Sequence, residues 1–213
     1  MLPLRHPSPA PWRAPDHVVV ETCVENIDGV RVSAQAGADR AELCDNIAVG
    51  GGRTLPPAVE LGFVTGALTE DGELDRGLVR LLVDMGDGAP VTLNRAINRA
   101  TDLERAYRSA ARLGLTHVLT DDVRERGGAE DTGLARLTAL ERQAARAGEP
   151  APRVIAAGDV RPQTMAALVA ASGVRELHLC CPAPADGRPG PHRTEQAQVR
   201  AAVEAARALP LPD

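Results

Sequence analysis

The segment Ala36-Gly37-Ala38-Asp39-Arg40-Ala41-Glu42-Leu43-Cys44 passes from the end of a helical pattern, through a glycine, into a short strand-like run. The same junction, in which a helix is followed by a glycine and then by a strand two or three residues later, recurs at Gly114 and Gly173. Glycine is the usual residue just past a helix end, where the backbone turns left-handed. A β/α unit repeated in this way predicts a parallel sheet with helices outside it.

Seven short runs are predicted to be the strands of this sheet, and most are apolar throughout, as strands buried on both faces are. They are residues 18–23, 40–44, 63–68, 91–94, 117–120, 154–157 and 176–179. The Gly-x-Gly-x-x-Gly fingerprint of dinucleotide-binding sheets does not follow the first strand. We therefore predict an α/β fold of the TIM-like (β/α) barrel type, with an open doubly wound sheet as the alternative.

The connection between the second and third of these strands is unusually short. Only eighteen residues separate Cys44 from Phe63, and they include the run Gly50-Gly51-Gly52 and the pair Pro56-Pro57. A parallel crossover needs about a dozen residues or more, so this link has room for a helix of about two turns at most. The structure is therefore expected to be abbreviated at this connection.

One of the predicted helices, which follows the strand at residues 63–68, has a clear apolar stripe. Its members are Leu74, Leu78, Leu81, Leu82 and Met85. Residues three and four apart lie on one face of a helix. The spacing therefore predicts a helix with a single apolar face.

Composition limits the function. The chain has 213 residues, a net charge of −5 and a hydrophobic fraction of 44%, which suit one globular domain. All 24 basic residues are arginine, and the only aromatic residues are Trp12, Phe63 and Tyr107. With neither a basic stripe nor stacking platforms for bases, no nucleic-acid partner is expected. No apolar run is long enough to span a bilayer, so no membrane partner is expected either.

The first sixteen residues contain five prolines and no continuous apolar core. They fit neither a signal peptide nor a helix, and we expect residues 1–16 to be a disordered tail and residues 17–213 to be a single barrel domain. Without a secretory signal the expected compartment is the reducing cytoplasm. The four cysteines are then expected to be thiols and not disulfides.

Three strand ends carry the residues of greatest chemical interest. Glu21-Thr22-Cys23 and Glu42-Leu43-Cys44 end the first two strands, and Glu176-Leu177-His178-Leu179-Cys180-Cys181 ends the last. Side chains alternate along a strand, so each Glu shares a face with its Cys, and His178 shares a face with Cys180. If the last strand lies beside the first, as in a sheet that closes on itself, three thiols and one imidazole converge on one rim. This convergence favours a soft-metal or thiol site.

The two glutamates of this pattern, Glu21 and Glu42, lie inside predicted barrel strands, two residues before Cys23 and Cys44. A buried carboxylate is costly unless it is paired, and Arg40 and Arg95 are the candidate partners. The alternative role is that of a general acid or base whose pKa is raised by its surroundings.

The chain resembles the CutC family of copper homeostasis proteins. The resemblance extends over nearly all of residues 18–181, and its most specific stretch is Gly37-Ala38-Asp39-Arg40-Ala41-Glu42-Leu43-Cys44. Further matching stretches are residues 21–23, 51–56, 61–68, 71–75, 94–96, 118–120 and 176–178. The resemblance implies a TIM-like barrel and a role in handling copper, with Cys23 and Cys44 at the positions of family cysteines proposed to bind Cu(I).

This chain departs from the family pattern in three places. The family's second helix, third strand and third helix have no counterpart between Pro57 and Leu61. The family segment His-Arg-Ala-Phe-Asp has become Asn94-Arg95-Ala96-Ile97-Asn98, and the tail after the last strand is short. The barrel is then expected to have seven strands or a gap, which a homodimer would fill, unless the chain is a degenerate member without activity.

Two functions of different classes follow. The first is a Cu(I)-binding protein that uses Cys23 and Cys44, with His178 and Cys180 as further ligands, because thiolates select Cu(I), with zinc as the main competitor. The second is an enzyme acting on a small anionic metabolite. In that case Arg95 and the turn at Gly158 would hold the anion, and Glu21 or Glu42 would transfer the proton.

Overall fold

The computed structural model describes residues 15–45, 51–52, 62–121, 132–158, 160–183 and 193–212. The expected proline-rich tail lies outside these residues except for its last two positions. The shortened connection between the second and third predicted strands lies outside them over residues 46–50 and 53–61.

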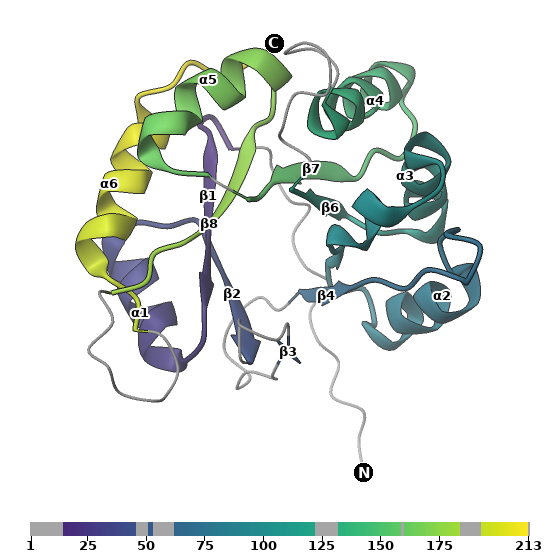
Figure 1. Cartoon of the computed structure of the whole chain (residues 1–213), viewed down its shortest axis with the longest axis horizontal. Helices are drawn as coiled ribbons and strands as arrows, with labels where there is room; N and C mark the ends of the chain where they lie inside the picture. The colour runs from purple at the N-terminus through teal and green to yellow at the C-terminus, as the bar shows by residue number, and fades with distance from the viewer. Residues whose placement is uncertain are drawn as a thin grey trace.

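The fold is built on seven parallel strands that curl into part of a barrel (Figure 1). They are β1 (Val19–Val24), β2 (Arg40–Asp45), β4 (Phe63–Thr65), β5 (Val91–Leu93), β6 (His117–Thr120), β7 (Arg153–Ala156) and β8 (Glu176–Cys180). All seven match the predicted strands, although β4 ends at Thr65 and not at Leu68. A two-residue strand, β3 (Gly51–Gly52), pairs antiparallel with β2.

The order of the parallel strands is β2-β1-β8-β7-β6-β5-β4. The last strand therefore lies beside the first, as in a closed barrel. β2 and β4, however, stand at the two ends of this series, and within the described residues they do not pair with each other. The expectation of an incomplete, seven-stranded TIM-like barrel is confirmed. We refer to the side of the barrel between β2 and β4 as the gap.

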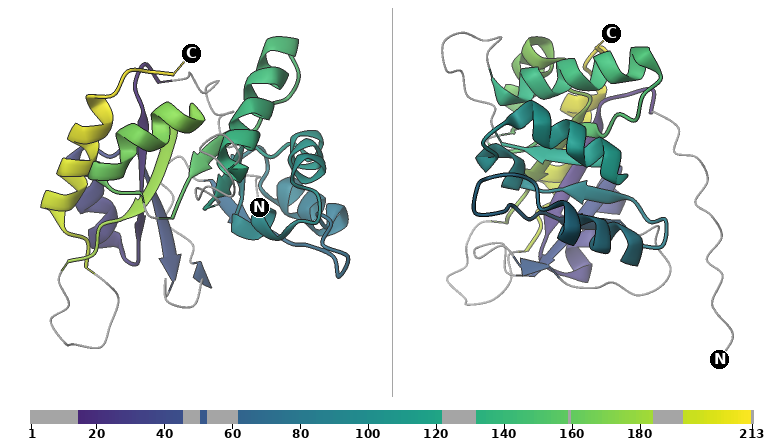
Figure 2. Two further views of the ribbon diagram at one scale, coloured as in Figure 1. Left: turned by 45° about the horizontal axis from the view of Figure 1, so that its top comes forward. Right: turned by 90° about the vertical axis from the view of Figure 1, so that its right-hand side faces the viewer.

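The described residues include six helices, and helices cover the outer face of the curled sheet, as Figure 2 shows from two further directions. They are α1 (Ile27–Ala36), α2 (Arg76–Met85), α3 (Leu103–Leu113), α4 (Gly133–Ala147), α5 (Pro162–Ser172) and α6 (Gln196–Arg207), with a 3-10 turn, η1 (Arg95–Arg99), before α3. Gly37, Gly114 and Gly173 each end a helix with positive φ, between 71° and 90°. The junction predicted from the sequence is thus the structural repeat of the fold.

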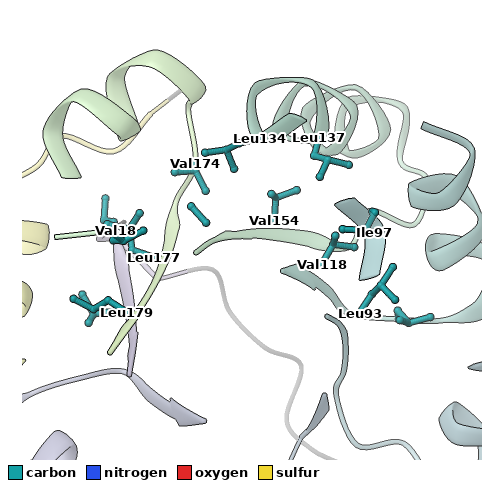
Figure 3. Packing of buried hydrophobic residues seen from close by; sticks show 14 of the residues in the cluster. Val18, Leu93, Ile97, Val118, Leu134, Leu137, Val154, Val174, Leu177 and Leu179 are labelled. Atoms are coloured by element: carbon teal, nitrogen blue, oxygen red, sulfur yellow. The ribbon is translucent and has the colours of Figure 1, made fainter. Parts of the chain in front are cut away.

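The main hydrophobic core lies between the sheet and these helices. In Figure 3, Leu134 and Leu137 of α4 point toward Val154 of β7, and all three are buried. On the other half of the sheet Leu177 and Leu179 of β8 belong to the same core. Because side chains alternate along a strand, the residues between these positions face the inside of the barrel.

The apolar stripe predicted for α2 is only partly buried. Val79, which was not counted in the stripe, is the helix residue that is buried, whereas Leu78, Leu81 and Met85 are exposed. The stripe therefore lies to one side of the surface that α2 presents to the sheet.

The inner face of the sheet carries a buried cluster of charges centred on Glu176 of β8. Its carboxylate accepts hydrogen bonds from Arg40 Nη2 of β2, at 2.5 Å, and from Arg153 Nε of β7. Arg40 also donates through Nε to Glu21 of β1, at 2.7 Å. Four strands are thus joined across the inner face by charged side chains, and Glu176 itself is almost completely buried.

His117 of β6 borders the same cluster. Its Nε2 lies 3.7 Å from Glu176 Oε2 and 3.4 Å from Arg40 Nη1. Burial lowers the pKa of His117 to about 4, against the opposing effect of the Glu176 charge. The imidazole is therefore neutral in the folded protein at neutral pH, whereas in the unfolded chain it takes up a proton near pH 6.5.

We expect Glu176→Gln to lower the free energy of unfolding by about 3 kcal/mol, because it leaves Arg40 and Arg153 partly buried without their countercharge. Urea unfolding at pH 7 measures the change. The matched control is Glu104→Gln, which removes an exposed ion pair with Arg108 on α3 and should cost less than about 1 kcal/mol. Equal effects of the two substitutions would contradict a structural role for the Glu176 cluster.

The depressed pKa of His117 predicts a loss of stability on acidification. A group with a lowered folded-state pKa contributes stability above its unfolded pKa and loses it as the pH falls, here from 6.5 toward 4. Between pH 7 and pH 5 the wild-type protein should lose about 2 kcal/mol more than His117→Asn. Urea unfolding of both proteins at the two pH values tests this, and parallel losses would show that His117 does not titrate as described.

Candidate metal centre

The strand ends singled out in the sequence meet on the inner face of the barrel. Register places Glu21 opposite His178 and Cys23 opposite Cys180 across β1 and β8. On the other side of β1, Cys23 lies opposite Glu42 of β2. Because the strands are parallel, these residues gather at the carboxyl ends of three adjacent strands, which is the end where barrel proteins build their sites.

Local structure fixes where these strands stop and how they align. The side chain of Asn26 accepts a hydrogen bond from Gly29 N at 2.8 Å and caps α1, so the chain turns away just beyond Cys23. Asp39, at the start of β2, accepts a hydrogen bond from Val20 N at 2.9 Å. This bond aligns β2 with β1. Cys44, at the far end of β2, then lies beside Cys23 of β1.

Three thiols lie in a row across the strands. Cys23 Sγ and Cys44 Sγ are 3.4 Å apart, and strand register places Cys180 of β8 opposite Cys23. The thiols differ in exposure, since Cys23 is buried, Cys44 is intermediate and Cys180 is exposed. The structure thus brings together all three cysteines that the sequence predicted to converge.

The imidazole of His178 is held beside these thiols by a carboxylate. His178 Nδ1 lies 2.8 Å from Glu21 Oε1, and His178 Nε2 lies 3.6 Å from Glu42 Oε2. Such a carboxylate fixes the orientation of the ring and leaves the other nitrogen as the ligand atom, as in many metal sites. Ligand atoms of Cys23, Glu42 and His178 all lie within 4.8 Å of one another.

Charge within the site is distributed unevenly. Burial alone would raise the pKa of Glu21, but the hydrogen bond from His178 and the charge of Arg40 lower it to about 2. Burial alone would lower the pKa of His178, yet its hydrogen bond to Glu21 raises it above the ordinary value. The Glu21 carboxylate is therefore firmly ionised and makes His178 a stronger base.

The thiols also differ in acidity. The hydrogen bond from Cys23, aided by the charge of His178, lowers the pKa of Cys180 to about 6 in spite of burial. Donating hydrogen bonds to Cys180 and Cys44, together with burial, raises the pKa of Cys23. The cluster therefore contains a thiolate near neutral pH, and the thiolate is the form that binds soft metals.

We define the thiol cluster as Cys23, Cys44, Cys180, His178 and Glu42. Its donors are three sulfurs, one imidazole nitrogen and one carboxylate oxygen. Soft thiolates favour Cu(I), while a mixture of sulfur, nitrogen and oxygen donors also suits Zn²⁺. The sequence placed Glu42 among the candidate acid–base groups, and only the register between β1 and β2 shows that it lies within reach of a shared ion.

The residues predicted to bind an anion lie elsewhere on the carboxyl rim, around Asp121 at the end of β6. Arg95 Nη1 donates to Asp121 Oδ2 at 2.9 Å, and Asn98 Nδ2 donates to the other carboxylate oxygen. A Cβ at Gly158 would come within 2.8 Å of Asp121 Cβ, so Gly158 is part of the same contact. Arg95 pairs with this carboxylate and not with Glu21 or Glu42. The pairing offsets the positive charge of Arg95 that would otherwise attract an anion.

Sequence reasoning missed the charged layer below the thiol cluster. His117, Arg153 and Glu176 occupy inward positions of three strands, two residues or more before the strand ends. Their alternation with apolar residues is the signal that could have found them.

No helix in the described part of the chain has the length and apolar character needed to cross a bilayer.

Comparison with known proteins agrees with this architecture. The model of the CutC family matches residues 18–61 and 53–182. A family protein CutC of Caulobacter vibrioides (strain NA1000 / CB15N) is 30% identical over 252 aligned positions, covering 90% of this chain and 98% of the relative. A family protein CutC of Agrobacterium fabrum (strain C58 / ATCC 33970) is 30% identical over 214 positions, covering 78% of this chain and 80% of the relative.

The alignment with the Caulobacter vibrioides protein also shows how many residues of that relative have no counterpart in this chain. Ninety per cent of this chain is about 192 residues, so about 60 of the 252 aligned positions of the relative face gaps in this chain. The two segments matched by the family model overlap at residues 53–61, between β2 and β4. Both observations agree with the loss of a segment at the gap.

Solved structures show the same fold. A CutC protein of Streptococcus agalactiae, whose name assigns it to copper homeostasis, superimposes with a TM-score of 0.58 at 19% identity, covering 76% of this chain and 98% of that one. A structure named native KDPGal gives the same TM-score at 17% identity, covering 92% of this chain and 97% of that one. Together with the family match and the 30% identity to CutC relatives, this shows that the chain belongs to the CutC family and is a member with an incomplete barrel.

Proposed function

We propose that this chain binds Cu(I) through Cys23 and Cys44, with His178 and Cys180 completing the ligand set, and that it serves copper homeostasis as a binding protein without turnover. The observation that carries the proposal is the 3.4 Å contact between Cys23 Sγ and Cys44 Sγ, on adjacent strands at the carboxyl rim. Two sulfurs this close can share one ion with little movement of the backbone.

The surroundings support a soft cation and not an anion. The carboxyl groups of Glu21 and Glu42 lie on either side of His178, and acidic groups at this place favour a positively charged ion. A thiolate at Cys180 adds to this charge. The copper ion is the cargo of such a site, and the protein contributes thiolates, an imidazole held by Glu21, and partial shielding from water.

The proposal includes a cytoplasmic location. Cys23, Cys44, Cys180 and Cys181 are all free thiols in the structure. A site made of closely spaced thiols persists in a reducing compartment and would be lost to oxidation in a secreted protein.

The first test is an anaerobic titration of the reduced protein with Cu(I) against a chromophoric chelator. We expect tight binding of about one ion per chain by the wild-type protein. The variant Cys23→Ser/Cys44→Ser should bind more than about 100-fold more weakly, because loss of the supporting groups around a metal ligand alone costs 10- to 100-fold. Zn²⁺ titrated in the same way establishes which ion the site prefers.

The matched control is Cys181→Ser. Cys181 neighbours Cys180 but is buried in the hydrophobic core, and burial raises its pKa to about 11. Its substitution should therefore leave Cu(I) affinity unchanged once folding has been verified by circular dichroism. Weak binding by the wild-type protein, or equal binding by the double variant, would refute the proposal.

Glu21 provides a second prediction, as a positioning residue for His178. Glu21→Gln keeps a hydrogen-bond acceptor but removes the negative charge, so Cu(I) affinity should fall about 10-fold. The pKa of His178, followed by NMR, should fall as well, because the carboxylate that raises it is gone. Glu104→Gln on the surface of α3 serves as the control, and an unchanged His178 titration in Glu21→Gln would contradict this role.

A further inference from the structure

Two sulfur atoms of the thiol cluster are close enough to bond to each other. Cys23 Sγ of β1 and Cys44 Sγ of β2 lie 3.4 Å apart, and both residues are free thiols. The S–S bond of a disulfide is about 2.05 Å long, so the two sulfurs need to approach each other by little more than about 1 Å. The structure thus holds these two thiols ready for oxidation to a disulfide.

The position of Cys44 on its strand makes this approach feasible. Register places Cys23 opposite Glu42, and Cys44 follows two residues later, next to the last residue of β2. The opposite end of β2 is fixed by Arg40, which binds both Glu176 and Glu21. Strand ends adjust at lower cost than strand centres. A small movement at the end of β2 can therefore close the bond while the buried charges below it stay in place.

The two thiols differ in how easily a reagent reaches them. Cys44 is partly exposed at the carboxyl rim, whereas Cys23 is buried beside it. Thiol–disulfide exchange proceeds through a mixed disulfide, and its rate depends on access to the attacking sulfur. A small disulfide in solution therefore meets Cys44 first, and Cys23 is placed to attack from within the protein.

We propose that the thiol cluster is also a site of thiol–disulfide exchange, at which a small organic disulfide converts Cys23 and Cys44 into a reversible disulfide. In the first step the Cys44 sulfur gives up its proton and attacks one sulfur of the small disulfide. The S–S bond of the reagent breaks, a mixed disulfide forms on Cys44, and the first small thiol leaves with a proton.

In the second step the Cys23 sulfur gives up its proton and attacks the Cys44 sulfur. The mixed disulfide breaks, the bond between Cys23 and Cys44 forms, and the second small thiol leaves with a proton. Two protein thiols are thereby oxidised and one small disulfide is reduced to two thiols, so no further oxidant is required.

The consequence for copper rests on the proposed function. A disulfide between Cys23 and Cys44 withdraws the two thiolates assigned to Cu(I), so the oxidised protein would release its ion. The exchange itself needs no metal and is tested on metal-free protein. Failure of Cu(I) binding by the reduced protein would therefore leave the exchange proposal intact, and failure of the exchange would leave Cu(I) binding intact.

Peptide mapping identifies the bond. The reduced, metal-free full-length chain is incubated with excess glutathione disulfide, its remaining thiols are blocked with iodoacetamide, and the protein is digested with trypsin. Cleavage after Arg31 and Arg40 separates Cys23 from Cys44, and the other two cysteines fall on a third peptide. Mass spectrometry should show the peptides of Cys23 and Cys44 joined to each other, and dithiothreitol should separate them.

Single substitutions test the order of the two steps. Cys23→Ser should retain glutathione on Cys44 at a level about 10-fold or more above that of the wild-type protein, because the thiol that displaces it is gone. Cys44→Ser should carry little glutathione on the buried Cys23. The matched control is Cys181→Ser, which removes a thiol of the hydrophobic core and should form the bond as the wild-type protein does. Circular dichroism verifies the fold of each variant.

Three results would overturn the proposal. One is a wild-type protein whose Cys23 and Cys44 both remain free thiols in excess glutathione disulfide. Another is a wild-type protein that keeps glutathione on Cys44 to the same extent as Cys23→Ser. The third is a bond from Cys23 to the peptide that contains Cys180 in place of the bond to Cys44.

Discussion

The carboxylate of Glu176 is the interaction on which this incomplete barrel depends. In a closed barrel the hydrogen-bond ladder runs around the full circle and sets the curvature of the sheet. Within the described residues, the series of parallel strands ends here at β2 and β4. Glu176 draws Arg40 of β2 and Arg153 of β7 toward one point on the inner face, with His117 of β6 beside them. Because these strands lie on both sides of β8, the charges bend the sheet inward.

The same cluster supports the thiol site one layer above it. Arg40 binds Glu176 with Nη2 and Glu21 with Nε, and Glu21 in turn orients His178. The ring that would bind a metal is thus connected through one carboxylate and one guanidinium to the most buried charge of the barrel. A ligand held in this way keeps its geometry without an ion, which lowers the cost of ordering the site when the ion binds.

The loss of a segment between β2 and β4 changes the surface of the protein more than its site. The strands that carry the thiol cluster, β2, β1 and β8, remain adjacent to one another although β2 borders the gap. The other half keeps its helices in order but leaves Leu78, Leu81 and Met85 of α2 exposed.

The sequence by itself determined the strands, the glycine-terminated helices and the cysteines and histidine of the thiol cluster. Local signals suffice for these, since alternation along a strand places Glu21 with Cys23, and His178 with Cys180, on one face. Only the tertiary structure decided that Glu42 lies within reach of His178 and Cys23, that Arg95 pairs with Asp121, and that α2 buries Val79 and leaves most of its predicted stripe exposed. These contacts join residues distant in the chain, and they depend on strand register and on which element is missing beside them. Neither of these is encoded in the spacing of residues within a single element.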